Sequence, residues 1–144
     1  MSSTEAMVTL QERIVNLVNQ LSMPILETSL VVGKWTAKMS EHLLEVARAH
    51  GENLPKEILQ PWELDVEPIK SNLEFDLEKA LSIVDEDRMD ILDTLIRVTI
   101  EETGLPMIDA LLLMRSWEKL VREQLSQASG PGQLFSPTII PEEF

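Results

Sequence analysis

Residues 105–127, LPMIDALLLMRSWEKLVREQLSQ, decide the fold that the sequence predicts. The leucine–proline pair is typical of a helix start, because proline fits the first turn, where its missing N–H has no partner anyway. From Met107 to Met114 apolar residues surround nearly the whole circumference, interrupted by Asp109. Such a segment is buried on several sides, in the middle of a bundle or in an oligomer interface. The second half is amphipathic, and its charged residues, Arg115 among them, are expected to face solvent.

Helical spacing of apolar side chains continues through most of the chain, and no stretch alternates as a β-strand does. Ser3 or Thr4 can cap the first helix, and Gly51 and Gly104 can end two others. The spacing predicts helices over residues 4–21, 24–50, 68–84, 85–103 and 105–127, with a further helical turn at 56–60. The predicted fold is therefore all-α, a compact bundle of about five helices with an irregular, proline-containing C-terminal tail.

Side-chain size and spacing predict two details of this bundle. The helix over 24–50 carries a strip of small residues that includes Gly33, so we expect either a close crossing with another helix or a break at the glycine. In the helix over 68–84, Leu81 is expected to face the core. Phe75 falls on the charged side of the same helix and is a candidate contact residue.

Composition and charge exclude several classes of function. The 144 residues include 12 basic and 25 acidic ones, a formal charge of −13, and no cysteine. Without cysteine there are no disulfides, no thiol catalysis and no thiolate metal sites. Because phosphate groups are bound by surplus lysine and arginine, the sequence predicts no direct binding of nucleic acid. The acidity is concentrated between Glu63 and Asp93, where eleven acidic and three basic residues give a net charge of −8.

The first residues, MSSTEAMVTLQER, have neither the basic start nor the apolar stretch of a signal peptide. The apolar run around residues 110–114 is far shorter than the roughly 20 residues that span a bilayer. We therefore expect no membrane insertion and a cytoplasmic location, while a virion or secreted location stays open.

A change of composition at Ser129 divides the chain into two predicted parts, a helical bundle over residues 1–128 and an extended tail over residues 129–144. The tail, SGPGQLFSPTIIPEEF, has three prolines and two glycines, which disfavour helix and sheet. It also has apolar side chains that gain free energy by leaving water. Three outcomes stay open: the tail folds back on its own bundle, docks on a partner or a second copy, or is disordered.

The sequence contains no catalytic constellation. It has no nucleophile motif and no glycine-rich phosphate loop, and its two histidines, His42 and His50, are spaced too far apart along one helix to bind one metal. We therefore expect a protein that is not an enzyme and has no cofactor or metal. One alternative is a magnesium-dependent, all-α nucleotide phosphohydrolase, in which Asp87, Asp90 and Asp93 on one helix flank hold the metal.

The leading hypothesis is a non-catalytic interaction protein: an adaptor, a chaperone-like assembly factor, or a structural subunit of a larger complex such as a secretion or a phage or virion assembly. The composition is similar to that of small acidic helical accessory proteins of these kinds. A second alternative is an acidic mimic that binds a basic protein. The expected partners are other proteins or further copies of the chain, bound through the apolar helix and the tail. The predicted contact residues are Leu134, Phe135, Ile139, Ile140, Phe144, Met107, Leu111, Met114 and Phe75.

Overall fold

The computed structural model describes residues 2–68 and 77–144. Helices form where apolar residues recur at three- and four-residue steps, which confirms the predicted all-α class. Within the described ranges there is no strand, and one isolated β-bridge joins Pro24 and Pro137. The elements are α1 (Ser3–Gln20), α2 (Ile25–Ala49), α3 (Lys56–Leu59), α4 (Leu77–Ile83), α5 (Glu86–Thr103), α6 (Met107–Ser126) and the 3₁₀-helix η1 (Pro131–Phe135).

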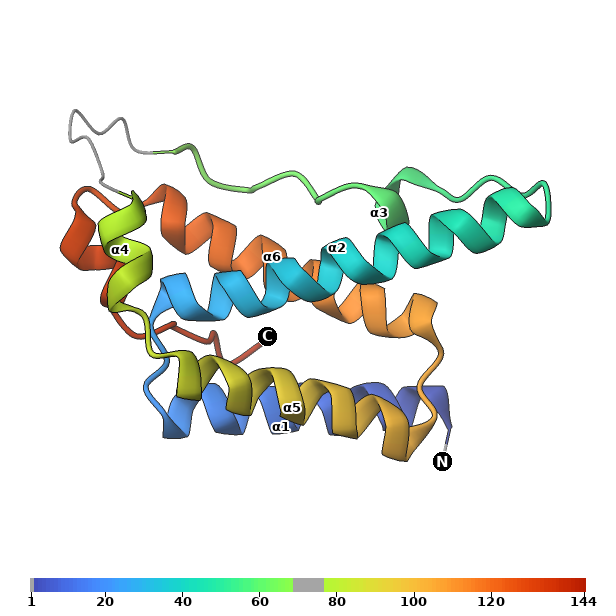
Figure 1. Cartoon of the computed structure of the whole chain (residues 1–144), viewed down its shortest axis with the longest axis horizontal. Helices are drawn as coiled ribbons and strands as arrows, with labels where there is room; N and C mark the ends of the chain where they lie inside the picture. Colours follow the sequence, from blue (N-terminus) through green and yellow to red (C-terminus); the bar gives the residue numbers. More distant parts are fainter. Residues whose placement is uncertain (1, 69–76) are drawn as a thin grey trace.

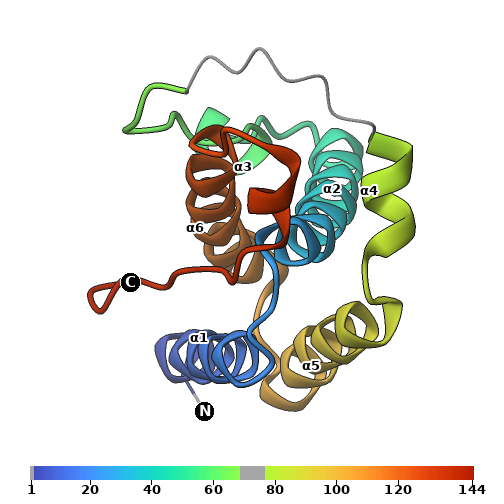
Figure 2. The same ribbon diagram turned by 90° about the vertical axis from the view of Figure 1, so that its left-hand side faces the viewer.

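Four long helices, α1, α2, α5 and α6, surround a common interior (Figure 1) and form the four corners of the end-on view (Figure 2). α1 and α2 run in opposite directions, as do α5 and α6, and each of these pairs is joined by a short loop. α2 and α5 run in the same direction, and residues 51–68 of the connection between them return along the outside of the bundle (Figure 1). This crossover contains the short helices α3 and α4. A long crossover of this kind is a known variation of the four-helix bundle.

The helix predicted over residues 68–84 is described at its two ends. Pro68 is not helical, and the described helical residues form α4 (Leu77–Ile83). Residues 69–76, which include the candidate contact residue Phe75, lie outside the described residues.

α4 also faces the bundle differently from the prediction. Leu81 is 40% exposed, whereas its neighbour Ala80 is buried. A helix of seven residues offers one short contact stripe, and here Ala80 fills it by packing in a small cluster with Leu26 and Leu134. The inward position of Leu81 is therefore corrected to a surface position.

Local capping signals fix the ends of the long helices. Ser2 caps α1, since its Oγ accepts a hydrogen bond from Glu5 N at 3.1 Å, so the predicted cap was placed slightly too late. Asp85 caps α5 by accepting hydrogen bonds from two backbone N–H groups of the first turn. Gly104 ends α5 with a φ angle of 64°, a left-handed conformation that strains residues with a Cβ.

α2 continues through Gly33 without a break. A Cβ atom added at Gly33 would meet nothing within 4 Å outside its own helix, so the predicted close helix crossing does not occur at this residue. The core instead lies between the large side chains of the four long helices. Its largest fully buried members are Trp117, Leu10, Ile14, Met23, Leu92, Ile96, Leu111 and Met114.

Arg115 corrects the prediction that the charged residues of the last helix all face solvent. Its side chain is only 4% exposed, because the crossover lays α3 over this side of α6. Arg115 Nε donates to the backbone oxygen of Ile58 at 3.2 Å, and Nη1 donates to Glu118 Oε1 at 2.9 Å. Glu118 Oε2 accepts in turn from Thr36 on α2. The buried charge is thus paired, as burial of a guanidinium requires.

Candidate functional site

The C-terminal tail folds back on its own bundle, which resolves the alternatives that the sequence left open (Figure 2). Leu134 of η1 is buried in the small cluster with Leu26 and Ala80. At the far end, the ring of Phe144 meets Trp117 edge-on, with ring centroids 4.8 Å apart. Aromatic pairs favour this geometry, because the positive ring edge faces the negative ring face.

Between these two anchors the tail is held by hydrogen bonds to the loop between α1 and α2 and to the first residue of α2. Ile25 N donates to Ser136 O at 2.9 Å, and Thr138 N donates to Met23 O at 2.8 Å. Thr138 is buried, and its hydroxyl lies 2.8 Å from that of Thr28. Buried hydrogen bonds of this kind fix the path of the tail backbone, since breaking them leaves polar groups without partners.

Gln124 of α6 clamps the next residue of the tail. Its side-chain Nε2 donates to the backbone oxygen of Ile139 at 2.5 Å, and its Oε1 accepts from Ile139 N at 2.9 Å. The backbone of Ile139 is therefore bonded on both its N–H and its C=O, whereas its side chain is 72% exposed. A large apolar side chain is displayed to solvent on an anchored backbone.

Ile139 lies at the edge of a groove of about 440 Å³ between α6, the tail and the crossover. The floor and walls are mostly apolar, and Val66 on the crossover is a second exposed apolar residue of its lining, at 39%. We call this feature the α6–tail groove. Its lining residues are Ile25, Val66, Leu120, Glu123, Gln124, Gln127, Ala128, Gln133, Ser136 and Ile139.

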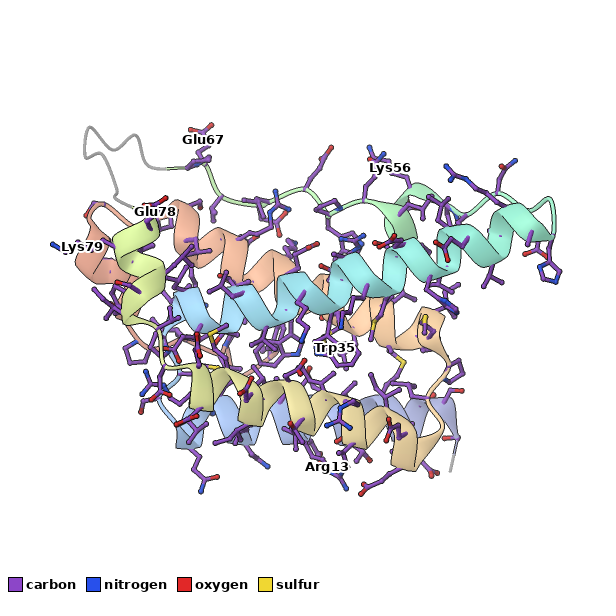
Figure 3. All side chains as sticks on the ribbon, viewed as in Figure 1. Arg13, Trp35, Lys56, Glu67, Glu78 and Lys79 are labelled. Carbon is purple, nitrogen blue, oxygen red and sulfur yellow. The ribbon has the colours of Figure 1, made fainter. Side chains whose placement is uncertain are left out.

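Polar groups tie the crossover to α6 beside this groove. Lys119 Nζ bonds Asp65 at 2.6 Å, and this hydrogen bond raises the pKa of Lys119 above its ordinary value. Glu123 Oε1 accepts from Asp65 N at 3.0 Å, and Gln127 Nε2 donates to Glu67 O at 2.7 Å. Figure 3 shows Glu67 on the extended segment of the crossover, with its side chain pointing away from the bundle. These bonds hold the crossover segment that carries Val66 next to α6.

A second cavity of about 580 Å³ lies between α1 and α6, next to Phe144. Gln11 of α1 lines it and is fully engaged: its Oε1 accepts from Trp117 Nε1 at 2.6 Å, and its Nε2 donates to Phe144 O at 3.4 Å. The exposed apolar member of this cavity is Val8, at 49%. Phe144 and Glu143 of the tail form one wall of this cavity, beside Val8 of α1 and Leu113 of α6.

The structure describes eight of the nine predicted contact residues, all except Phe75, and separates them. Leu111 and Met114 are fully buried and Leu134 is 8% exposed, so these three have almost no surface to offer a partner in this fold. Phe135, Ile140 and Phe144 are half-buried in the docked tail. Met107 is exposed at another cavity, lined also by Trp35, which Figure 3 shows between α2 and α5. Ile139 is the member that lines the α6–tail groove.

The alternative metal site is not assembled in the described part of the chain. Asp87 and Asp90 are exposed, and Asp93 Oδ2 pairs with Lys34 at 3.4 Å. Among residues 2–68 and 77–144, no group of three histidine or acidic side chains could hold a metal ion. Both histidines are exposed, and neither belongs to such a group within these ranges.

Sequence reasoning missed the polar residues that shape this region. Glu27 is completely buried and accepts two hydrogen bonds from Arg88, each 2.8 Å long. Glu27, Val31 and Trp35 follow one another at intervals of four residues, and the last two lie on the inner side of α2. This helical spacing is the sequence signal that places Glu27 inside. Gln124 likewise follows the buried Val121 by three residues on α6. The position of Val66 beside α6 has no sequence signal, because it depends on the path of the crossover.

Two further findings concern membrane-spanning helices and similarity to known proteins. Within the described residues, no helix combines the length and the apolar character needed to cross a membrane. Comparison of the chain with models of protein families, with curated proteins and with solved structures found no match.

Proposed function

We propose that this protein is a non-catalytic interaction protein and that it binds a partner protein at the α6–tail groove. The observation that carries the proposal is Ile139, a 72% exposed apolar side chain on a backbone held by Gln124. Roles that fit this activity are those of an adaptor, a chaperone-like assembly factor or a structural subunit of a complex. The proposed compartment is the cytoplasm.

Physical chemistry supports an anchored apolar side chain as a contact residue. Interfaces derive most of their binding energy from a few residues that fill pockets and lose their water on binding. A side chain on a mobile loop loses conformational freedom when it is captured, and this loss weakens binding. The hydrogen bonds to the N–H and C=O of Ile139 hold its backbone, so the backbone part of that loss is small when a partner binds.

The chemistry of the chain supports a function without catalysis. The sequence has no cysteine, and its two histidines, His42 and His50, are both exposed. Within the described residues, no three histidine or acidic side chains are close enough to hold a metal. A binding role uses the features that the chain has, an apolar groove and an acidic surface.

Photocrosslinking tests the proposal. Benzoylphenylalanine is placed at Ile139 in one variant and, as a matched control, at Ile83, which is 58% exposed on α4. We expect a specific crosslinked protein from the Ile139 variant and not from the control. The captured protein is then purified, and its affinity for the wild-type chain and for Ile139→Asp and Ile83→Asp variants is measured by calorimetry.

The substitution at the groove is expected to weaken binding by at least about tenfold, or about 1.4 kcal/mol, and the control substitution to leave it unchanged. Equal affinity of the Ile139→Asp variant and the wild-type chain would show that the groove is not the binding site. Unfolding curves of both variants check that neither change acts through the fold.

A further inference from the structure

The α6–tail groove has a negative charge in an otherwise uncharged lining. Glu123 contributes this charge, and its side chain is 23% exposed. The ammonium group of Lys119 lies 4.0 Å from Glu123 Oε1, but its short contact, at 2.6 Å, is with Asp65. Glu123 therefore shares Lys119 with Asp65 through the longer of the two contacts, and a half-buried carboxylate with a single distant cation gains free energy from a second cation.

The surroundings of the groove are also negative. Asp65 and Glu67 flank Val66 on the crossover and are exposed, the Asp65 side chain at 79%. The other basic residue of α6 next to Glu123, Arg122, donates to the backbone oxygen of Trp62 at 3.1 Å. With a net charge of −13 on the whole chain, the field around the groove attracts basic segments and repels acidic ones.

Side-chain amides in the groove are suited to a peptide backbone. In the described residues, Gln127 Oε1 and Gln133 Nε2 have no hydrogen-bond partner, while the other atom of each amide holds the protein's own backbone. Gln124 shows the same chemistry within this chain, because its amide bonds both backbone groups of Ile139. An extended segment offers free N–H and C=O groups to such amides, whereas a helix has already paired its own.

We infer that the α6–tail groove binds an extended peptide segment in which apolar side chains alternate with, or adjoin, a lysine or arginine. The apolar side chains contact Val66 and Ile139, and the cation pairs with Glu123. This inference rests on the proposed function, whose groove it describes in more detail. The groove volume of about 440 Å³ lies within the range of pockets that bury most of a small ligand, so it limits the bound segment to a few side chains.

Amide NMR of the full chain, titrated with three capped peptides, tests the inference. The probe has the sequence Gly-Lys-Ile-Val-Lys-Gly, the charge control replaces both lysines by glutamate, and the polarity control replaces isoleucine and valine by serine. We expect the probe to shift the backbone signals of Ile139 and Gln127 and the side-chain signal of Gln133. Each control peptide should bind at least about tenfold more weakly.

A Glu123→Gln variant then tests the assigned cation partner. Glutamine keeps an oxygen that can accept from Asp65 N, so the crossover wall is retained. The variant should bind the lysine peptide several-fold more weakly and discriminate less between lysine and glutamate peptides. Glu101→Gln, at an exposed residue of α5, should change neither. An unchanged preference in the Glu123→Gln variant would overturn the assignment.

The outcomes separate this inference from the proposed function. Equal binding of the lysine and glutamate peptides, shifts at another surface, or no binding of any peptide would contradict the inference. A scattering mass of a dimer that Ile139→Asp reduces to a monomer would also contradict it, because the occupant would be a second copy. The proposed function fails separately, if Ile139→Asp leaves the affinity for the captured partner unchanged.

Discussion

At the scale of single residues, the buried ion pair of Glu27 and Arg88 joins the start of α2 to the start of α5. Arg88 Nε and Nη2 donate to the two carboxylate oxygens of Glu27, each at 2.8 Å, and Asp85 N donates to Glu27 Oε2 at 3.2 Å. The hydrogen bonds that Arg88 donates to Glu27 raise the pKa of Arg88 above its ordinary value. Because Glu27 is completely buried, its charge depends on these donors.

The substitution Glu27→Gln is expected to lower the free energy of unfolding by about 2–3 kcal/mol. It removes the completely buried carboxylate and leaves Arg88, whose side chain is 34% exposed, without its charged partner. Urea unfolding followed by circular dichroism measures this change. The control is Glu102→Gln, which breaks an exposed pair with Arg13, with side chains 56% and 41% exposed. Exposed pairs contribute up to about 1 kcal/mol, so a control as destabilising as Glu27→Gln would contradict the explanation.

Lys119 makes the free energy of unfolding depend on pH, and the direction of this dependence follows from the raised pKa of Lys119. Its hydrogen bond to Asp65 raises the pKa of Lys119 in the folded state above the unfolded value, near 10.5. The stabilisation is therefore complete below the unfolded pKa and is lost as the pH rises through the folded pKa. We expect the stability difference between wild-type and Lys119→Met chains to be constant from neutral pH to about pH 9 and to shrink in more alkaline solution. A difference that grows with alkaline pH would contradict this pairing.

At the scale of secondary structure elements, two glycines with different backbone conformations make a matched test. Gly33 lies inside α2 with open space around its missing Cβ, whereas Gly104 ends α5 with φ at 64°. Gly33→Ala is expected to raise the free energy of unfolding by about 0.5–1 kcal/mol, because glycine loses more backbone entropy in a helix. Gly104→Ala is expected to lower it by about 1–2 kcal/mol through left-handed strain. Thermal unfolding of both variants measures these two changes. A destabilised Gly33→Ala chain would indicate a close neighbour at Gly33.

The tail is expected to contribute to stability through one residue and to binding through another. Leu134 is 8% exposed and packs on Leu26 and Ala80, so Leu134→Ala should lower the free energy of unfolding by about 2 kcal/mol. Ile139 is 72% exposed, so Ile139→Ala should change it by less than about 0.5 kcal/mol. Equal effects of the two substitutions in urea unfolding would mean that the tail is not docked as described.

The bounds of helices, which depend on nearby residues, could be predicted from the sequence. The burial of side chains that depends on the path of the crossover could not. The bounds of α1, α2, α5 and α6 follow apolar spacing and capping residues within a few positions, because both signals act over one or two helical turns. The burial of Arg115 could not be predicted, because α3, which covers it, reaches α6 only through the path of the crossover. The same holds for Leu81, whose exposure depends on where α4 lies.

At the scale of the whole molecule, the candidate site is formed by segments that are far apart in the sequence. Val66 comes from the crossover, Glu123 from α6 and Ile139 from the tail, and their meeting requires both the crossover and the tail to return to α6. The sequence indicated Ile139 as an apolar residue in an irregular tail, but it could not indicate the other walls of the groove. It also left open whether the tail docks on its own bundle.

Charge and apolar surface are combined at this groove. The sector from Glu63 to Asp93, with a net charge of −8, includes the crossover wall that carries Val66. An acidic wall beside an apolar floor favours partners that are both basic and apolar, and it disfavours association with other acidic chains. The acidity that argues against nucleic acid as a partner thus becomes part of the specificity of the proposed site.

Ile139 is exposed on an ordered backbone, and NMR relaxation of the amides of the full chain tests this order most directly. The account predicts order parameters for Thr138 and Ile139 of about 0.85, the value of rigid backbone, equal to those of the long helices. Order parameters below about 0.6 at these two amides, with rigid helices in the same sample, would show a mobile tail and contradict the account.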